Sequence, residues 1–166
     1  MWKVGETTIH PKIGACQIKE IKELVILGAK HQCLVLVPLF ENDNNLKVTL
    51  PVENSGRVGL RRPISIEKIE EIKLRLSQEV EAEAINGQEI SLPVLQNKIL
   101  SGDPFKIAEV IRDLHAKIKQ DGGKYANARR QAFLKKTQQR LIREISLSSG
   151  ISIRETTLQI RSLLGG

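Results

Sequence analysis

The chain has 166 residues, of which 40% are hydrophobic and 27% charged, and it carries 26 basic against 19 acidic side chains. This length suits one ordinary domain or two small ones, and the composition excludes a disordered tail and a fibrous repeat. The net charge of +7 favours anionic partners, such as nucleic acid or an acidic protein surface. No apolar run approaches the roughly 20 residues of a membrane helix, so no membrane partner is expected.

The first third of the chain predicts a small sheet, because short β-rich runs alternate with turn residues. Four strands are expected, of which the second reads as one bent strand or as two: 7–9, 15–27, 32–37 and 46–52. The last run alternates cleanly and places four apolar residues on one face: Leu46, Val48, Leu50 and Val52. Four or five strands in about 60 residues favour a small closed barrel, because closure removes exposed strand edges.

From residue 64 onward the pattern predicts helices. Ser65 and Ser152 are placed to cap two of them, with Ile66 and Ile153 opening their apolar stripes. Between them, residues 91–100 favour a short helix. The next boundary is the strongest local signal: Gly102 ends one helix, Asp103 caps the next and Pro104 takes its first position. The sequence therefore predicts an all-β domain, residues 1–63, followed by an all-α domain of four or five helices, residues 64–166.

Positive charge concentrates in the last part of the chain. Residues 1–63 carry a net +3, residues 64–90 a net −4, and residues 91–166 a net +8. In the helix expected over about 127–147, four basic residues fall opposite the apolar stripe: Arg129, Lys136, Arg140 and Arg143. Residues 112–143 hold 10 basic groups and only two acids, which is less mixed than a solubilising face. This pattern favours contact with phosphates over a merely solvated face, and both interpretations stay open.

The sequence offers no catalytic constellation. It lacks GxSxG, Walker A and HExxH motifs, so we expect no enzymatic activity and no cofactor. Cys16 and Cys33 sit in apolar surroundings and are interpreted as reduced core residues of a cytosolic protein. The three histidines form no zinc-ligand spacing with them, so no metal is expected, and His115 is interpreted as a surface or packing residue.

Three groups of residues, in order along the chain, are shared with one known family. They are Lys3 to Glu6 with Pro11 and Gly14; Leu50 to Asn54 with Val58 to Arg61; and Ser101 to Asp103 followed by Ile107 to Leu114. In these residues the chain resembles the CarD family of bacterial transcription regulators. The resemblance covers roughly residues 2–163.

The resemblance implies an α+β two-domain adaptor. Residues 1–63 would form a small Tudor-like β-barrel that binds the β subunit of bacterial RNA polymerase. Residues 64–166 would form an all-α domain that contacts promoter DNA at the upstream edge of the transcription bubble. Such a protein stabilises the open complex, for example at ribosomal RNA promoters, as a cytoplasmic, nucleoid-associated monomer.

The resemblance also implies site residues. The polymerase-binding edge would contain Lys47, Thr49 and Pro51. The DNA-binding surface would contain Gln88 together with Arg129, Lys136, Arg140 and Arg143. The family carries a Trp at the position of Gln88, where an apolar wedge substitutes for lost base stacking. Because Gln offers no such ring, one alternative is a polymerase-binding interaction module with a weakened DNA role. The positive charge of residues 112–143 leaves a second alternative open, a general basic DNA-binding protein.

Overall fold

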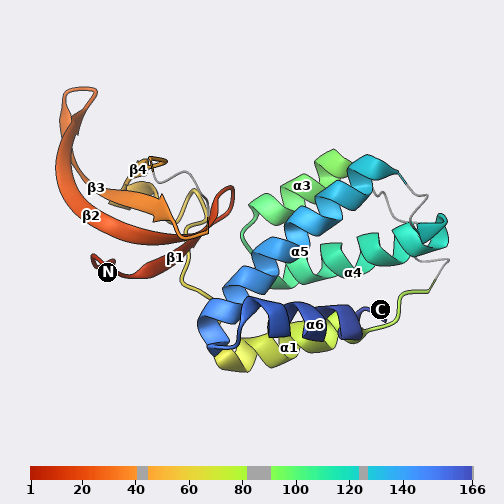
Figure 1. Cartoon of the computed structure of the whole chain (residues 1–166). Helices are drawn as coiled ribbons and strands as arrows, with labels where there is room; N and C mark the ends of the chain where they lie inside the picture. The colour runs from red at the N-terminus through yellow and green to blue at the C-terminus, as the bar shows by residue number, and fades with distance from the viewer. Residues whose placement is uncertain (41–44, 82–90, 124–126, 166) are drawn as a thin grey trace. The chain divides into compact units, whose positions relative to one another are not determined.

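The computed structural model describes residues 1–40, 45–81, 91–123 and 127–165. The chain divides into two compact units, Met1–Pro63 and Ile64–Gly166. The first unit is built on a β-sheet and the second on α-helices (Figure 1). No helix in the described ranges is long and apolar enough to cross a membrane.

The first unit contains an antiparallel sheet with the strand order β1-β2-β3-β4. Its elements are β1 (Thr7–His10), β2 (Gly14–Ile26), β3 (Ala29–Pro38), β4 (Val48–Pro51) and the short 3-10 helix η1 (Val52–Asn54). The long second run is one strand, which absorbs its bend in a bulge between Ile18 and Glu20. The run expected to end at Val52 stops at Pro51, because proline has no N–H to continue the ladder.

The sheet is open in the described part of the chain, so the closed Tudor-like barrel expected from the sequence is not confirmed. The outer edge of β1 is covered only by an isolated antiparallel bridge between Ile9 and Arg61, whose backbone groups exchange hydrogen bonds of 2.8 and 3.1 Å. At the other edge of the sheet, no described strand pairs with β4 on its outer side. Closure depends on contacts between distant segments, which a pattern of strands and turns does not specify.

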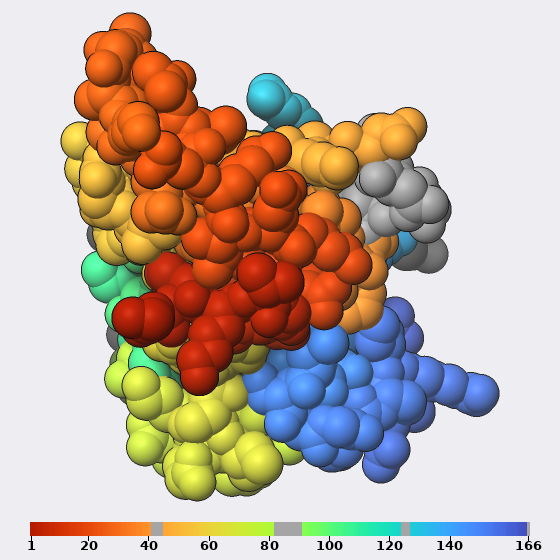
Figure 2. Space-filling model, turned by 90° about the vertical axis from the view of Figure 1, so that its left-hand side faces the viewer, coloured from red at the N-terminus to blue at the C-terminus, as the bar shows by residue number. Residues whose placement is uncertain are grey.

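β2 and β3 form a hairpin that is longer than the rest of the sheet. β1 pairs with β2 only as far as Gln17, and β4 pairs with β3 only from Cys33 onward. The hairpin, drawn in orange, projects from the surface of its unit (Figure 2). Leu27 and Gly28 make its two-residue turn with φ of 50° and 82°, as the twist of a tight hairpin requires. Such a turn needs no third residue, so β3 begins at Ala29 rather than at Gln32 as expected.

The two ends of the first unit are tied together beside a small core. The core cluster consists of six buried residues: Cys16, Ile18, Leu34, Leu36, Leu50 and Leu60. Trp2 packs against this cluster, and its indole N–H donates to Ser55 Oγ at 3.3 Å. The Arg62 guanidinium carbon lies 4.7 Å from the centre of the Trp2 ring, and Arg62 Nε donates to Glu6 Oε1 at 2.6 Å. We call Trp2, Glu6 and Arg62 the N-terminal latch.

The second unit contains five described helices: α1 (Ile66–Ser77), α3 (Leu92–Leu100), α4 (Pro104–Gln120), α5 (Ala128–Ser149) and α6 (Ile153–Leu163). Three of their starts are the predicted ones. Ser65 Oγ accepts from Lys68 N at 3.4 Å, a carboxylate oxygen of Asp103 accepts from Phe105 N at 2.9 Å, and Ser152 Oγ accepts from Glu155 N at 3.1 Å. Each cap satisfies a backbone donor that the first turn leaves without a helical partner.

α4 lies at the centre of the helical core and packs against α1, α3 and α5 (Figure 1). Ile111 and Leu114 on α4 are fully buried. The predicted stripes are wrong at their first residues, because Ile66 is 62% and Ile153 43% exposed. Helical side chains lean toward the N-terminus, so the first residue of a helix points past its end rather than onto the core.

A buried carboxylate fixes the start of the helical unit. Glu144 on α5 is only 4% exposed, and its Oε1 accepts a 2.9 Å hydrogen bond from the backbone N–H of Ile64, which is itself buried. Burying a carboxylate without a hydrogen-bond partner would lower the stability of the unit by roughly several kcal/mol, so this hydrogen bond contributes to the stability of the fold. No local sequence pattern predicts this contact, because the two residues are far apart in the chain.

Candidate functional site

β4 forms one edge of the sheet in the described residues. Val48 and Leu50 lie on the face that packs on the core cluster. Because side chains alternate along a strand, Thr49 and the preceding Lys47 lie on the opposite face, and both are exposed. Pro51 is half-buried and ends the strand opposite Cys33. The three residues predicted to contact polymerase therefore lie on or directly beside one edge strand.

The backbone of an edge strand can pair with another chain. On the outer side of β4, backbone N–H and C=O groups have no partner strand among the described residues, which is the geometry used for strand addition. The strand is only 4 residues long, and Pro51 supplies no N–H. The edge is thus short and polar, which suits a specific partner better than indiscriminate aggregation.

α5 begins with a concentration of positive charge. Asn127 Oδ1 caps the helix by accepting from the backbone N–H groups of Arg129 and Arg130 at 2.9 and 3.3 Å. The first turn contains no acidic residue. The exposed Arg129 therefore adds to the positive end of the helix dipole, which makes this end of α5 attractive to anions.

The four basic residues predicted to share one face of α5 do so. Buried residues of the same helix, including Leu134, Leu141 and Ile145, occupy the other side. The exposure of the basic face decreases along the helix. Its N-terminal members, Arg129 and Lys136, are exposed. Its C-terminal members, Arg140 and Arg143, are half-buried and make further interactions. The exposed pair is the part of the face best placed to meet a ligand from solvent.

The two acids within residues 112–143, Asp113 and Asp121, form ion pairs with cations outside the basic face. Asp113 Oδ1 accepts from Arg112 Nε at 2.8 Å. Asp121 lies 3.2 Å from Lys117 Nζ and 3.4 Å from Arg130 Nη1. None of these three cations belongs to the predicted basic face. Neither acid, in these contacts, neutralises that face.

Two further residues complete the description of this surface. Lys135, which the face analysis did not include, is also exposed on α5, next to Lys136 in the chain. The count of basic residues over 112–143 was the only sequence signal for it. Gln88, which the resemblance places at the wedge position, lies outside the described residues.

Neither surface carries groups suited to covalent chemistry. In the described ranges no three His, Cys, Asp or Glu side chains gather so that they can hold a metal ion. Both cysteines are buried and free, and burial raises the pKa of the Cys16 thiol to about 11, so it stays protonated at neutral pH. What the edge and the basic face offer is backbone pairing and positive charge, which are means of binding.

Two ranges of the chain match known domain families. Residues 2–64 match the model of the CarD-like/TRCF RID domain. Residues 94–161 match the model of the CarD C-terminal domain. The first range contains β4, and the second contains all of α4 and α5, so both candidate surfaces fall within matched ranges.

Proposed function

Because this chain belongs to the CarD family of transcription regulators that interact with RNA polymerase, we propose that it docks on the polymerase β subunit through β4 and contacts promoter DNA through α5. The family assignment confirms the expectation drawn from the sequence. In this proposal the protein acts without catalysis, as a monomer in the bacterial cytoplasm at the nucleoid. It stabilises the open promoter complex, for example at ribosomal RNA promoters.

One observation supports the DNA contact above all others: the two exposed cations of the basic face, Arg129 and Lys136, are not paired with either acid of the basic stretch. Asp113 and Asp121 pair with cations off the basic face, while Arg129 and Lys136 remain exposed. Phosphate contacts of this kind give affinity without base specificity and release counterions. The expected binding is therefore weak, nearly independent of sequence and sensitive to salt.

The polymerase contact is supported by the edge position of β4. Lys47 and Thr49 are exposed on one face of this edge segment, so a strand of the partner can pair with the backbone edge while these side chains set its register. Docking on polymerase raises the effective concentration of α5 near the promoter, so weak DNA affinity suffices. The open complex is stabilised only if the protein binds it more tightly than the closed one.

A second candidate function is favoured by Gln88. An amide at the family's Trp position lacks the apolar ring that replaces base stacking at the bubble edge. A protein built this way can occupy polymerase without prolonging the open complex. It then acts as an interaction module or as a competitor of other polymerase-binding factors.

The half-life of promoter complexes with the full-length chain tests both candidates. Lys47→Glu with Thr49→Ala alters the edge, and Arg129→Gln with Lys136→Gln alters the exposed part of the basic face. Controls of matched charge are Lys19→Glu for the edge and Lys98→Gln with Lys106→Gln for the face, all at exposed positions. The proposal predicts that the edge variant loses polymerase β in a pull-down. It also predicts that the face variant keeps polymerase but loses the longer half-life.

The other outcomes separate the alternatives. If native protein and face variant bind polymerase alike and neither changes the half-life, the protein is an interaction module. If the edge variant retains full effect, docking through β4 is wrong. Four phosphate contacts predict a log–log salt slope of about −3.6, and removing two cations should flatten it to about −1.8. An unchanged slope would show that the face is only solvated.

A further inference from the structure

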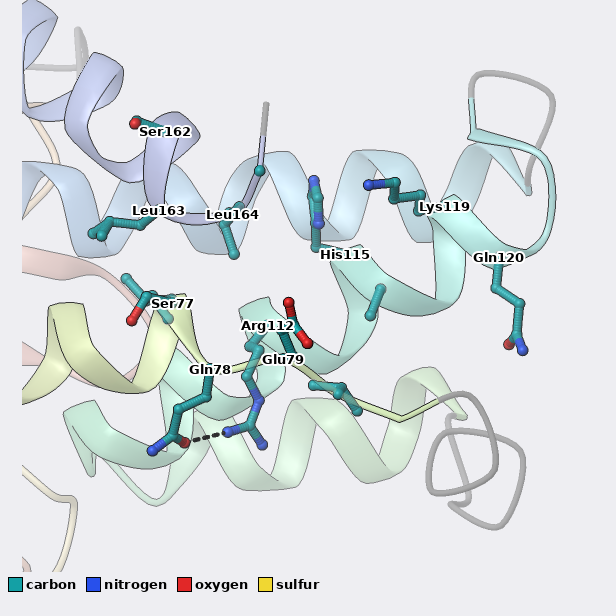
Figure 3. Close-up of a pocket in the computed structure, with 14 residues that line it drawn as sticks. Ser77, Gln78, Glu79, Arg112, His115, Lys119, Gln120, Ser162, Leu163 and Leu164 are labelled. Carbon is teal, nitrogen blue, oxygen red and sulfur yellow. Dashed lines mark hydrogen bonds between the residues drawn. The ribbon is translucent and has the colours of Figure 1, made fainter.

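The helical unit contains a pocket that the proposed function does not use. Its volume is about 600 Å³, and its walls come from the end of α1, one side of α4 and the end of α6 (Figure 3). Pockets of about 300–1,000 Å³ are the usual size for small-molecule ligands. The lining is mixed, and five aliphatic side chains supply its apolar part: Leu76, Val80, Ala116, Leu163 and Leu164.

Three basic side chains from one side of α4 line the same pocket. Arg112, His115 and Lys119 are spaced i, i+3 and i+7, so they share a helix face. Arg112 is already engaged, because its Nε donates to Asp113 and its Nη1 donates to Gln78 Oε1 at 3.0 Å, the contact dashed in Figure 3.

His115 and Lys119 differ from Arg112 in having no carboxylate partner among the described residues. Figure 3 shows both side chains rising from the same side of α4. His115 is half-buried, and burial together with the charge of Lys119 lowers its pKa. Both causes disfavour a second positive charge at this place as long as no anion is present.

We propose that this pocket binds a small amphipathic anion, an aromatic ring system that carries one acidic group. The ring packs against the aliphatic residues of α6 and α4, and the acidic group lies between His115 and Lys119. The anion supplies a counter-charge to His115 and Lys119, because Glu79, the one acidic residue among the described residues that line the pocket, makes no ion pair with either of them. This site is separate from the β4 edge and from the basic face of α5, and its test does not involve polymerase.

Binding at this site is linked to protonation. An anion beside His115 favours the imidazolium form, so the complex takes up a proton and affinity rises as the pH falls. The charged groups around His115 are Lys119 and Arg112 on α4 and Glu79 after α1. The pocket residues of α6 and its C-terminal end are uncharged: Ser162, Leu163, Leu164 and Gly165.

Titration of the full-length chain with anilinonaphthalene sulfonate tests the proposal, because this fluorescent dye combines an apolar ring system with one sulfonate. Uncharged anilinonaphthalene is the control ligand, and it should bind more weakly. Lys119→Gln should weaken dye binding about fivefold, the usual size of one partly solvated charge contact. Lys106→Gln, an exposed lysine of the same helix outside the pocket, should leave dye binding unchanged.

The pH dependence gives a second readout. Between about pH 5 and pH 8, affinity should rise with acidity in the native protein and in Lys119→Gln, but not in His115→Gln. Should His115→Gln fail to fold, proton NMR of the native protein replaces it: the dye should raise the pKa of His115.

Three results would overturn the proposal. Lys119→Gln and Lys106→Gln could bind the dye equally, or the uncharged ligand could bind as tightly as the sulfonate. A short DNA duplex could also displace the dye, which would assign His115 and Lys119 to a DNA-binding surface instead of a small-molecule pocket.

Discussion

The two units of this protein are stabilised in different ways. The first has a core cluster of six residues, and its ends are tied by the N-terminal latch and the bridge between Ile9 and Arg61. In its described residues, the second has sixteen buried apolar residues gathered around α4. A small core excludes less apolar surface from water, so polar contacts carry a larger share of the stability of the first unit. Each unit should therefore respond to a different kind of substitution.

The largest expected effect tests the helical core. Leu114→Ala removes a fully buried side chain from α4 and should cost about 2–5 kcal/mol, because a cavity remains. Far-UV circular dichroism reports mainly the helices, while the fluorescence of the single Trp, Trp2, reports the first unit. The helical transition should move to lower denaturant and the Trp2 transition should stay. Leu158→Ala, on an exposed residue of α6, is the control. A joint shift of both transitions would show that the units unfold as one.

The second prediction concerns the first unit and tests the N-terminal latch. Arg62→Ala removes a cation–π contact with Trp2, an ion pair with Glu6 and a hydrogen bond to the Met1 carbonyl. Because these contacts are largely exposed, their combined loss should cost about 1–2 kcal/mol. The Trp2 transition should move and the helical transition should not. Arg57→Ala, an exposed arginine of the same unit, should change neither transition, and an equal loss there would remove the special role of the latch.

A smaller effect is expected at a helix start. Asp103→Ala removes the carboxylate that caps α4 and should destabilise the helical unit by about 1 kcal/mol. Asp103→Asn keeps an accepting oxygen at the same place and should cost much less. Circular dichroism during denaturation measures both variants. Equal losses from the two would show that capping is not what Asp103 contributes.

The smallest effect concerns pH. Burial works to raise the pKa of Glu6, but hydrogen bonds from the Lys3 backbone and from Arg62 outweigh it and hold this pKa below the ordinary 4.5. The resulting stability is fully present above the unfolded-state pKa and is lost as the pH falls through the folded-state pKa. The Trp2 transition should therefore weaken with acid in the native protein and less so in Glu6→Gln. Identical acid profiles would contradict the contribution of Glu6.

Local signals in the sequence predicted the helices well. The caps at Ser65, Asp103 and Ser152 each act within three residues, so neighbouring letters contain all the information that such a start requires. The sheet was harder to predict. Its extent depends on pairing with distant residues, as in the Ile9 to Arg61 bridge, and closure of a barrel cannot be deduced from alternation along single strands.

The candidate site shows the same limit. Helical periodicity placed four basic residues on one face of α5 correctly. The pairing of Asp121 with Arg130 could not be deduced in this way, because it depends on the packing of α4 against α5. The pocket beside His115 likewise depends on the packing of three helices, which a lone histidine in a sequence cannot indicate.

The burial of the two cysteines makes their alkylation rate a measure of how often the sheet opens transiently. Both thiols, Cys16 and Cys33, are fully buried in the first unit, and these are the only two cysteines of the chain. Because both side chains are fully buried, an alkylating reagent reaches them only when the sheet transiently opens, and in the closed sheet the raised pKa of Cys16 keeps that thiol protonated at neutral pH. The rate of alkylation therefore counts excursions of the sheet alone. If polymerase pairs with the edge of β4, its binding should slow alkylation. This should hold even where binding does not change the equilibrium unfolding of the helices.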